Sequence, residues 1–347
     1  MLKFINRKTI MWLSGFFLVV GLTVYRAQEE FLSALSHINP GWLILLLVLQ
    51  FITLLLLVYQ WYYILNKKGN ISFREVLVIY LTGSFVESTT PSTKFGGETA
   101  RFCLFRKHTR LNNTELSAVV CLQKYILMVP FILISFLSVF LASVRGLIVP
   151  EAVHYTLIIT VLAGIFSYLF FRVINLFNLG KQLNFSRILK DYVQVYTPEF
   201  FLNMITKTVR FGQEVLSDIK ISLKESPGYH LYVISLAVWL LYPLKMYLAA
   251  SMIGLNTGPA FIILVTFVCY LVGILPLTPG GLGTFEGTAG LMFALNGFLF
   301  AEGLVVAVVV RLATYWFPLF LSLLAAVYLF GLRDQQLTSG QPLEEGN

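Results

Sequence analysis

Long apolar runs separated by short polar segments dominate this chain. A helix that crosses a bilayer needs about twenty mostly apolar residues. Runs that approach this length occupy 9–25, 40–65, 73–90, 114–142, 152–174, 229–253, 259–276, 284–300 and 303–330. The pattern therefore predicts an all-α polytopic membrane protein.

One long polar region, 175–228, interrupts the apolar pattern. Its lysines and arginines are interleaved with apolar residues at helical spacing, namely Phe201, Ile205, Val209, Leu216 and Ile219. Such spacing suits amphipathic helices that lie on a cytoplasmic membrane surface, and a small solvated helical loop is the alternative. In either case we expect the region to belong to a single transmembrane domain, 1–332, followed by a polar cytoplasmic tail, 333–347.

Positive charge predicts the orientation of the spans, because lysine and arginine favour cytoplasmic loops. Lys3, Arg7 and Lys8 place the N-terminus in the cytoplasm. If 73–90 crossed completely, the basic segment 94–110 would face outside. A re-entrant hairpin removes this conflict: helix 73–87 enters from the cytoplasm, the chain turns through 88–97, and a short charged helix returns from Glu98.

A second hairpin is predicted for 259–300. The flanking loops 254–258 and 300–303 contain no lysine or arginine, so both can lie outside. The residues Pro276 to Gly283 then form the tip at membrane depth. The sequence thus predicts about six full transmembrane helices plus two oppositely oriented re-entrant hairpins. This is an inverted-repeat-like pattern in which both termini are cytoplasmic.

Composition supports a membrane protein and excludes several other classes. The chain is 57% hydrophobic and 12% charged, with a mean hydropathy of +0.79, whereas soluble domains are roughly a quarter charged. Its net charge of +8 fits topology and anionic lipid headgroups rather than nucleic acid. Three scattered cysteines, four scattered histidines and the absence of a phosphate-binding loop predict no metal, no cofactor and no ATP drive.

The two predicted hairpin tips carry similar motifs. In the first, Thr90-Pro91 precedes Gly96, Gly97 and Glu98; in the second, Thr278-Pro279 precedes Gly280, Gly281, Gly283 and Glu286. Glycine permits close approach of the backbone to a ligand, and broken helices line substrate sites in many transporters. The alternative is that these glycines only permit close helix packing, while the glutamates form structural ion pairs.

Ionisable residues within the apolar segments mark the candidate site, because burying charge in a membrane is costly. We expect lipid phosphate to be attracted by four cations, Lys94, Arg101, Lys245 and Arg311. Glu98 and Glu286 would engage a cationic headgroup or hold these cations in place. Glu98 is three residues from Arg101, and Glu286 is in a segment adjacent to that of Arg311, so both pairs can form.

Three stretches resemble the signature regions of a known family. They are PSTKFGGETAR (Pro91 to Arg101), PLTPGGLGTFEG (Pro276 to Gly287) and RLATYWFP (Arg311 to Pro318). They resemble the lysylphosphatidylglycerol synthase transmembrane region family, which includes the flippase half of a bifunctional bacterial synthase and flippase. The bifunctional enzyme carries an aminoacyl-transferase domain after its membrane region, whereas this chain ends at Asn347, so lysyl transfer is not expected.

The resemblance implies a flippase-like or scramblase-like protein of the cell membrane. We expect it to move a phospholipid, or a related lipid such as a polyprenyl phosphate, through a polar groove between the hairpins. Two alternatives stay open: a membrane-embedded enzyme that uses Glu98 and Glu286 as acid and base, and an ion-coupled transporter of small solutes. The sequence leaves a homodimer open.

Overall fold

The computed structural model describes residues 40–90, 94–151, 228–273 and 278–338, together with Tyr155 and parts of 211–219. These residues form helices and no strands. The helices are α3 (Pro40–Gly69), α4 (Phe73–Thr89), α5 (Lys94–His108), α6 (Asn113–Val144), α10 (Tyr229–Met252), α11 (Pro259–Gly273), α12 (Thr284–Leu295), α13 (Phe300–Arg311) and α14 (Phe317–Thr338), with a 3-10 turn η2 (Pro279–Gly281) and a π-helical segment η3 (Leu312–Trp316).

Four helical stretches in the described part of the chain are long and apolar enough to cross a membrane. They are Pro40–Lys67, Asn113–Val144, Tyr229–Met252 and Phe300–Leu329, and each coincides with a crossing that the sequence predicts. The predicted span 9–25 lies outside the described residues, as do almost all of 152–174 and most of the basic region 175–228.

Two helix boundaries in the C-terminal half differ from the prediction. The segment 284–300 does not form one helix, because α12 ends at Leu295 and α13 begins at Phe300. Gly297, with φ of 87°, supplies the left-handed residue that ends α12, and Phe298 N–H donates to the carbonyl of Phe293 over 3.1 Å. At the other end, α14 continues to Thr338, so the first residues of the expected tail are helical.

The first helical pair also begins differently from the prediction. The sequence predicts a turn through 88–97 and a helix from Glu98, whereas α5 begins at Lys94. Gly97 lies inside α5, where an added Cβ would come within 2.9 Å of the carbonyl oxygen of Gly83 on α4. Gly97 therefore permits close packing of α5 on α4, and Glu98 is in the second turn of α5 rather than the first.

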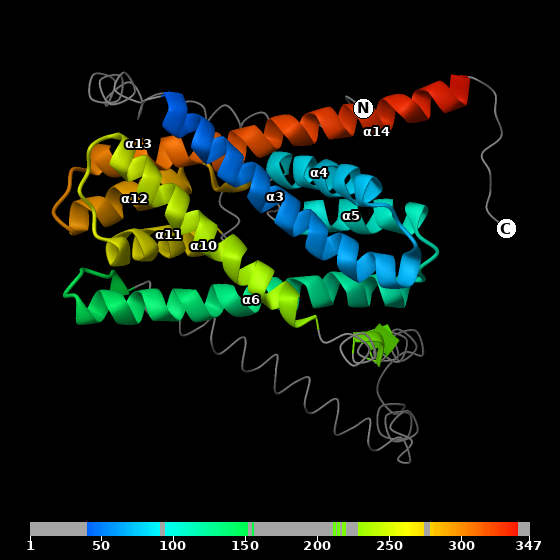
Figure 1. The fold of residues 1–347 in the computed structure, drawn as a ribbon, viewed down its shortest axis with the longest axis horizontal. Helices are drawn as coiled ribbons and strands as arrows, with labels where there is room; N and C mark the ends of the chain where they lie inside the picture. Colours follow the sequence, from blue (N-terminus) through cyan, green and yellow to red (C-terminus); the bar gives the residue numbers. More distant parts are fainter. Residues whose placement is uncertain are drawn as a thin grey trace, which may run out of the picture.

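The helices form two antiparallel pairs that enter the bundle from opposite ends (Figure 1). We call α4 and α5 the first hairpin, and α11 and α12 the second hairpin. The helices α3 and α10 run side by side on a diagonal through the bundle, and α6 and α14 flank the bundle on opposite sides (Figure 1). The hydroxyl of Tyr315 donates to the carbonyl of Ser88 at 3.2 Å, and its ring lies against Gly280. The two turns therefore meet beside Tyr315.

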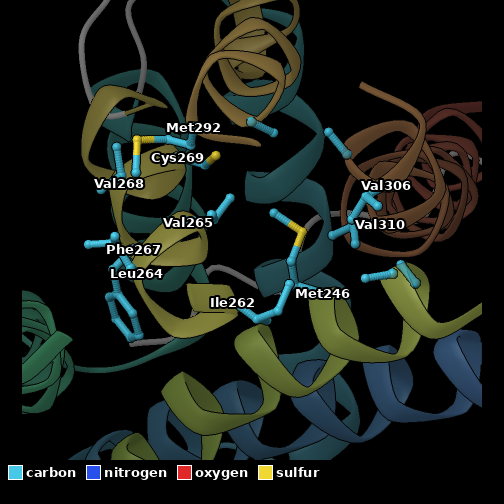
Figure 2. Close-up of a cluster of buried hydrophobic side chains, with 14 of the residues drawn as sticks. Met246, Ile262, Leu264, Val265, Phe267, Val268, Cys269, Met292, Val306 and Val310 are labelled. Atoms are coloured by element: carbon cyan, nitrogen blue, oxygen red, sulfur yellow. The ribbon is translucent and has the colours of Figure 1, made fainter. Parts of the chain in front are cut away.

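Each hairpin packs in its own hydrophobic cluster. Around the second hairpin, residues such as Met246, Val265, Met292 and Val306 join α10, α11, α12 and α13 (Figure 2). Around the first hairpin, a separate cluster that includes the fully buried Trp61 joins α3, α4, α5 and α6. The two apolar clusters hold the hairpins on either side of a polar centre.

Candidate functional site

A cavity of about 260 Å³ lies between the two hairpins. Its polar lining consists of Glu87, Arg101, Gln123, Lys124 and Arg311. Its aromatic lining consists of Trp61, Tyr80, Trp239, Tyr242, Tyr270 and Phe285. Glycine backbone from the second hairpin, at Gly273, Gly280 and Gly281, completes the wall. The cavity thus combines cations, aromatic faces and bare backbone from both halves of the chain.

Arg101 is the central residue of the first hairpin. Only 3% of its surface is exposed, and its Nη2 donates to Glu87 at 2.9 Å and to Ser84 at 2.8 Å. Its Nη1 donates to Glu98, and its guanidinium lies 4.6 Å from the centre of the Tyr80 ring. These bonds use most of its five N–H donors. Arg101 therefore ties α5 to α4 and keeps little capacity for a ligand.

Glu98 is shared by two cations. Its Oε1 accepts from Arg101 Nη1 on the same helix and from Lys124 Nζ on α6, each over 2.5 Å. Its other oxygen, Oε2, is buried and has no hydrogen-bond partner among the described residues. The Lys124 side chain is 36% exposed. Glu98 thus connects the first hairpin to α6, and Lys124 is the most accessible member of the group.

Arg311 has the corresponding place beside the second hairpin. Its Nε donates to Glu286 Oε1 at 3.1 Å, and its Nη2 donates to the carbonyl of Gly280 at 2.6 Å. The guanidinium lies against the rings of Phe285 and Tyr315, at 5.0 and 4.6 Å from their centres. Its Nη1 makes no hydrogen bond within the described chain. Arg311 is thus held on one side while part of its donor fork stays available.

Glu286 caps the start of α12, in which it is the third residue. Its Oε2 accepts from the backbone N–H of Gly283 at 2.7 Å, while Oε1 accepts from Arg311. Both carboxylate oxygens are therefore occupied. An acidic residue in the first turn also complements the partial positive charge of a helix N-terminus. The arrangement assigns Glu286 to holding Arg311 and the hairpin tip.

The glycines of the two similar motifs have different structural tasks. Gly96 and Gly97 lie in the helical backbone of α5. Gly280, Gly281 and Gly283 instead have φ of 61°, 69° and 78°, in the left-handed region that glycine adopts readily. The close-packing alternative thus holds for Gly97, whereas the second motif breaks the helix as the sequence predicts.

Lys245 lies outside the cavity lining, although the sequence placed it in the site. It is fully buried, and its Nζ donates to Gln50 at 2.5 Å and to Thr53 at 3.2 Å, which joins α10 to α3. The ammonium also lies 4.3 Å from the centre of the Tyr242 ring, which does line the cavity. Lys245 thus contacts the wall of the site from behind.

Two predicted residues are placed by their backbone alone. Lys94 is the first residue of α5 and Pro279 is the first residue of η2, and their side chains lie outside the described part of the structure. At the tip itself, the Thr278 hydroxyl donates to the carbonyl of Leu282 at 2.7 Å, and Gly281 N–H donates to the carbonyl of Thr278 at 3.1 Å. These bonds close the turn that Pro279 opens.

Several lining residues were not in the predicted site. Glu87 and Lys124 carried a detectable signal, because each is an ionisable residue in a mainly apolar segment. The aromatic residues carried none, since the chain has 30 phenylalanines, 17 tyrosines and 5 tryptophans. Tyr315 lies in the third signature stretch, and the π-helical segment that contains it follows Arg311 directly. Such segments often mark functional sites.

Comparisons with known proteins give one family match and several relatives. The family described as "Lysylphosphatidylglycerol synthase TM region" matches residues 11–322. A UPF0104 membrane protein of Methanothermobacter thermautotrophicus is 25% identical over 344 residues, which cover 97% of this chain and 94% of the relative. The UPF0104 membrane protein MJ1595 of Methanocaldococcus jannaschii is 22% identical over 331 residues, with coverage of 94% and 96%. No solved structure matches the chain.

Proposed function

This chain belongs to the lysylphosphatidylglycerol synthase transmembrane region family, and from that premise and the geometry of the cavity we propose that it moves a phosphate-headgroup lipid between membrane leaflets. The observation that carries the proposal is the cavity itself, in which a buried arginine of the first hairpin, a buried arginine at the end of α13 and the glycine backbone of the second hairpin meet. Polar residues of this kind inside an apolar bundle are costly and mark substrate pathways in membrane proteins.

The proposal includes re-entrant hairpins. The helices α11 and α12 have 15 and 12 residues, so they are about 22 and 18 Å long, shorter than the roughly 30 Å hydrocarbon core. The basic residues also favour this arrangement. At the end of the bundle where the first hairpin begins and ends lie Lys67, Arg74, Arg106, Lys107 and Arg110. In the described loops at the opposite end, Arg145 is the single cation.

The cavity favours a phosphate as the group that is bound. Within the described part of the chain, Arg311 Nη1 has no hydrogen-bond partner and lies near the bare backbone of the second hairpin tip, and arginine is well suited to phosphate oxygens. The aromatic wall can contact the glycerol and carbonyl region of a lipid, while the acyl chains stay in the bilayer. Opposed hairpins around one site allow it to open to either leaflet when the two halves rock against each other.

The alternative of an acid and base enzyme has less support from this geometry. Glu286 uses both oxygens for Arg311 and Gly283, and Glu98 is bonded to two cations. A general acid or base must reach the reacting group of the substrate. No histidine of the described chain lines the cavity. We therefore propose transport rather than bond cleavage.

The test is translocation of fluorescent lipid in liposomes that contain the purified protein. Wild type should speed leaflet exchange, and Glu286→Ala and Arg311→Ala should each lower the protein-dependent rate by about tenfold or more, because truncating one member of a buried charge pair costs several kcal/mol. Lys107→Ala removes one exposed cation far from the cavity and should keep the wild-type rate. Elution of every variant as a folded species on size exclusion is the control.

The outcome that contradicts transport is equally specific. Transport is contradicted if lipid exchange is no faster than in protein-free liposomes for each of the anionic, zwitterionic and polyprenyl-phosphate probes, with and without a proton gradient. Release of a cleaved product from the same lipids would then favour the enzyme. Uptake of a solute that depends on Glu98 and Glu286 but tolerates loss of the arginines would favour the ion-coupled transporter.

A further inference from the structure

The two halves of the described chain repeat the same order of elements. A long helix, a hairpin and a second long helix occur as α3, α4 with α5, and α6, and again as α10, α11 with α12, and α13 through α14. The second set runs in the opposite direction along the bundle (Figure 1). Residues of the two halves correspond at nearly constant spacing: Thr90 with Thr278, Pro91 with Pro279, Glu98 with Glu286, Glu115 with Glu302, and Pro130 with Pro318.

This correspondence pairs Lys124 with Arg311. Lys124 follows Glu98 by 26 positions, and Arg311 follows Glu286 by 25. Glu115 and Glu302 each cap the start of their long helix, and each precedes its cation by nine positions. In both halves, the cation of the long helix forms an ion pair with the glutamate of the preceding hairpin and lines the same cavity.

The two cations differ in how firmly they are held. Arg311 is the one cation paired with Glu286 in the described chain, and its side chain is 9% exposed. Lys124 shares Glu98 with Arg101 and is 36% exposed. If Lys124 turned toward a ligand, Glu98 would keep Arg101 as its partner and no carboxylate would be left unpaired. Lysine also has a flexible stem and a compact ammonium with three donors.

Two unpartnered polar atoms belong to residues that line the cavity together with Lys124. The side-chain oxygen of Gln123 and the indole N–H of Trp61 are both buried, both belong to residues that line the cavity, and neither has a hydrogen-bond partner among the described residues. Leaving such groups unpaired costs free energy, which a ligand or water recovers by bonding them. This second observation, independent of the repeat, points to a binding position beside Lys124.

We propose that Lys124 forms a second anion subsite, related to the Arg311 subsite by the internal repeat. The phosphate of one lipid would contact Lys124 in one state and Arg311 in the other, as the two repeats exchange conformations. The inference rests on the proposed function, because it assigns a second contact to the same transported headgroup. It distinguishes Lys124 from Arg101, whose donors are committed to the first hairpin.

The test is binding of a water-soluble phosphatidic acid with two six-carbon chains to the purified full-length protein in detergent. Trp61 and Trp239 line the cavity, so tryptophan fluorescence reports occupancy. Lys124→Gln should weaken binding by about tenfold, Lys124→Arg should restore it to within about threefold, and Lys107→Gln should leave it unchanged. The matching diacylglycerol, which lacks the phosphate, should bind no more weakly to Lys124→Gln than to wild type. Lys124→Gln should keep its melting temperature, because Glu98 retains Arg101.

Each result separates the subsite from the proposed function. If Lys124→Gln binds the probe and moves lipid as wild type does, while Arg311→Gln does neither, the second subsite is wrong and transport stands. If Lys124→Gln weakens the probe and the diacylglycerol equally, Lys124 acts through packing and the proposal also fails. If wild type neither binds the probe nor moves lipid, the proposed function itself is wrong.

Discussion

Gly280 is a residue whose backbone and surroundings both demand glycine. Its φ of 61° is in the left-handed region, and an added Cβ would collide with the ring of Tyr315. Its carbonyl accepts from Arg311 at 2.6 Å. One residue thus sets the turn, the position of Tyr315 and the orientation of the candidate phosphate-binding arginine.

We predict that Gly280→Ala lowers the thermal stability of the purified protein more than Gly254→Ala does. Gly254 also has positive φ, at 77°, but an added Cβ there meets nothing within 4 Å. Both variants incur the left-handed penalty of about 1–2 kcal/mol, and Gly280→Ala adds overpacking of about 1–3 kcal/mol. Melting curves in detergent measure the difference. Equal melting temperatures would mean that Tyr315 does not pack against the tip.

At the scale of helices, the first hairpin depends on close contact between α4 and α5. An added Cβ on Gly97 would lie 2.5 Å from Glu87 Cβ and 2.9 Å from the Gly83 carbonyl oxygen. On the other helix, a Cβ on Gly83 would collide with the stem of Arg101. These two glycines let the helices approach closely enough for Arg101 to reach Glu87 and Ser84.

The corresponding prediction is that Gly97→Ala destabilises the protein and lowers lipid translocation, because α5 must move away from α4 and Arg101 loses its bonds. The matched control is Gly287→Ala, which is also within a helix but meets nothing within 4 Å. Alanine favours helix over glycine by about 1 kcal/mol, so the control should be neutral or more stable. Melting temperature and translocation rate test both variants, and a stable, active Gly97→Ala protein would contradict this packing.

At the scale of the whole molecule, the proposed topology places both ends of the first hairpin in the cytoplasm and both ends of the second hairpin outside the cell. Single cysteines at Lys107, Asn256 and Leu299 probe exposed positions at these ends. They are introduced after Cys103, Cys121 and Cys269 have been replaced by serine. In whole cells, a membrane-impermeant thiol reagent should label positions 256 and 299, and should label position 107 only after the membrane is permeabilised.

The reason is the distribution of charge. If α4 crossed completely, the basic end of α5 would face outside, against the preference of lysine and arginine for the cytoplasm. Labelling of position 107 in intact cells would therefore show that the first hairpin crosses the membrane. Labelling of all three positions from the same side would also remove the basis for opposed hairpins and for the repeat exchange proposed above.

Sequence by itself determined the helical class, the four described helices that are long and apolar enough to cross a membrane, and the break at Gly280 and Gly281, because these depend on local hydropathy and backbone freedom. It also allowed a pairing of Glu98 with Arg101, since three positions along a helix bring side chains together, and the structure forms this pair. For Glu286 and Arg311, the sequence showed only that they are in adjacent segments, which makes a pair plausible. The structure shows that this pair forms.

Only the tertiary structure decided which buried groups share the cavity. Lys245 and Lys124 are alike in sequence, each a lysine within an apolar helix, yet Lys245 faces α3 and Lys124 lines the cavity beside Glu98. The two similar glycine motifs likewise separate into a packing contact at Gly97 and a turn at Gly280. The physical reason is that these differences depend on the rotation and close approach of helices, which packing between distant segments sets and local sequence does not.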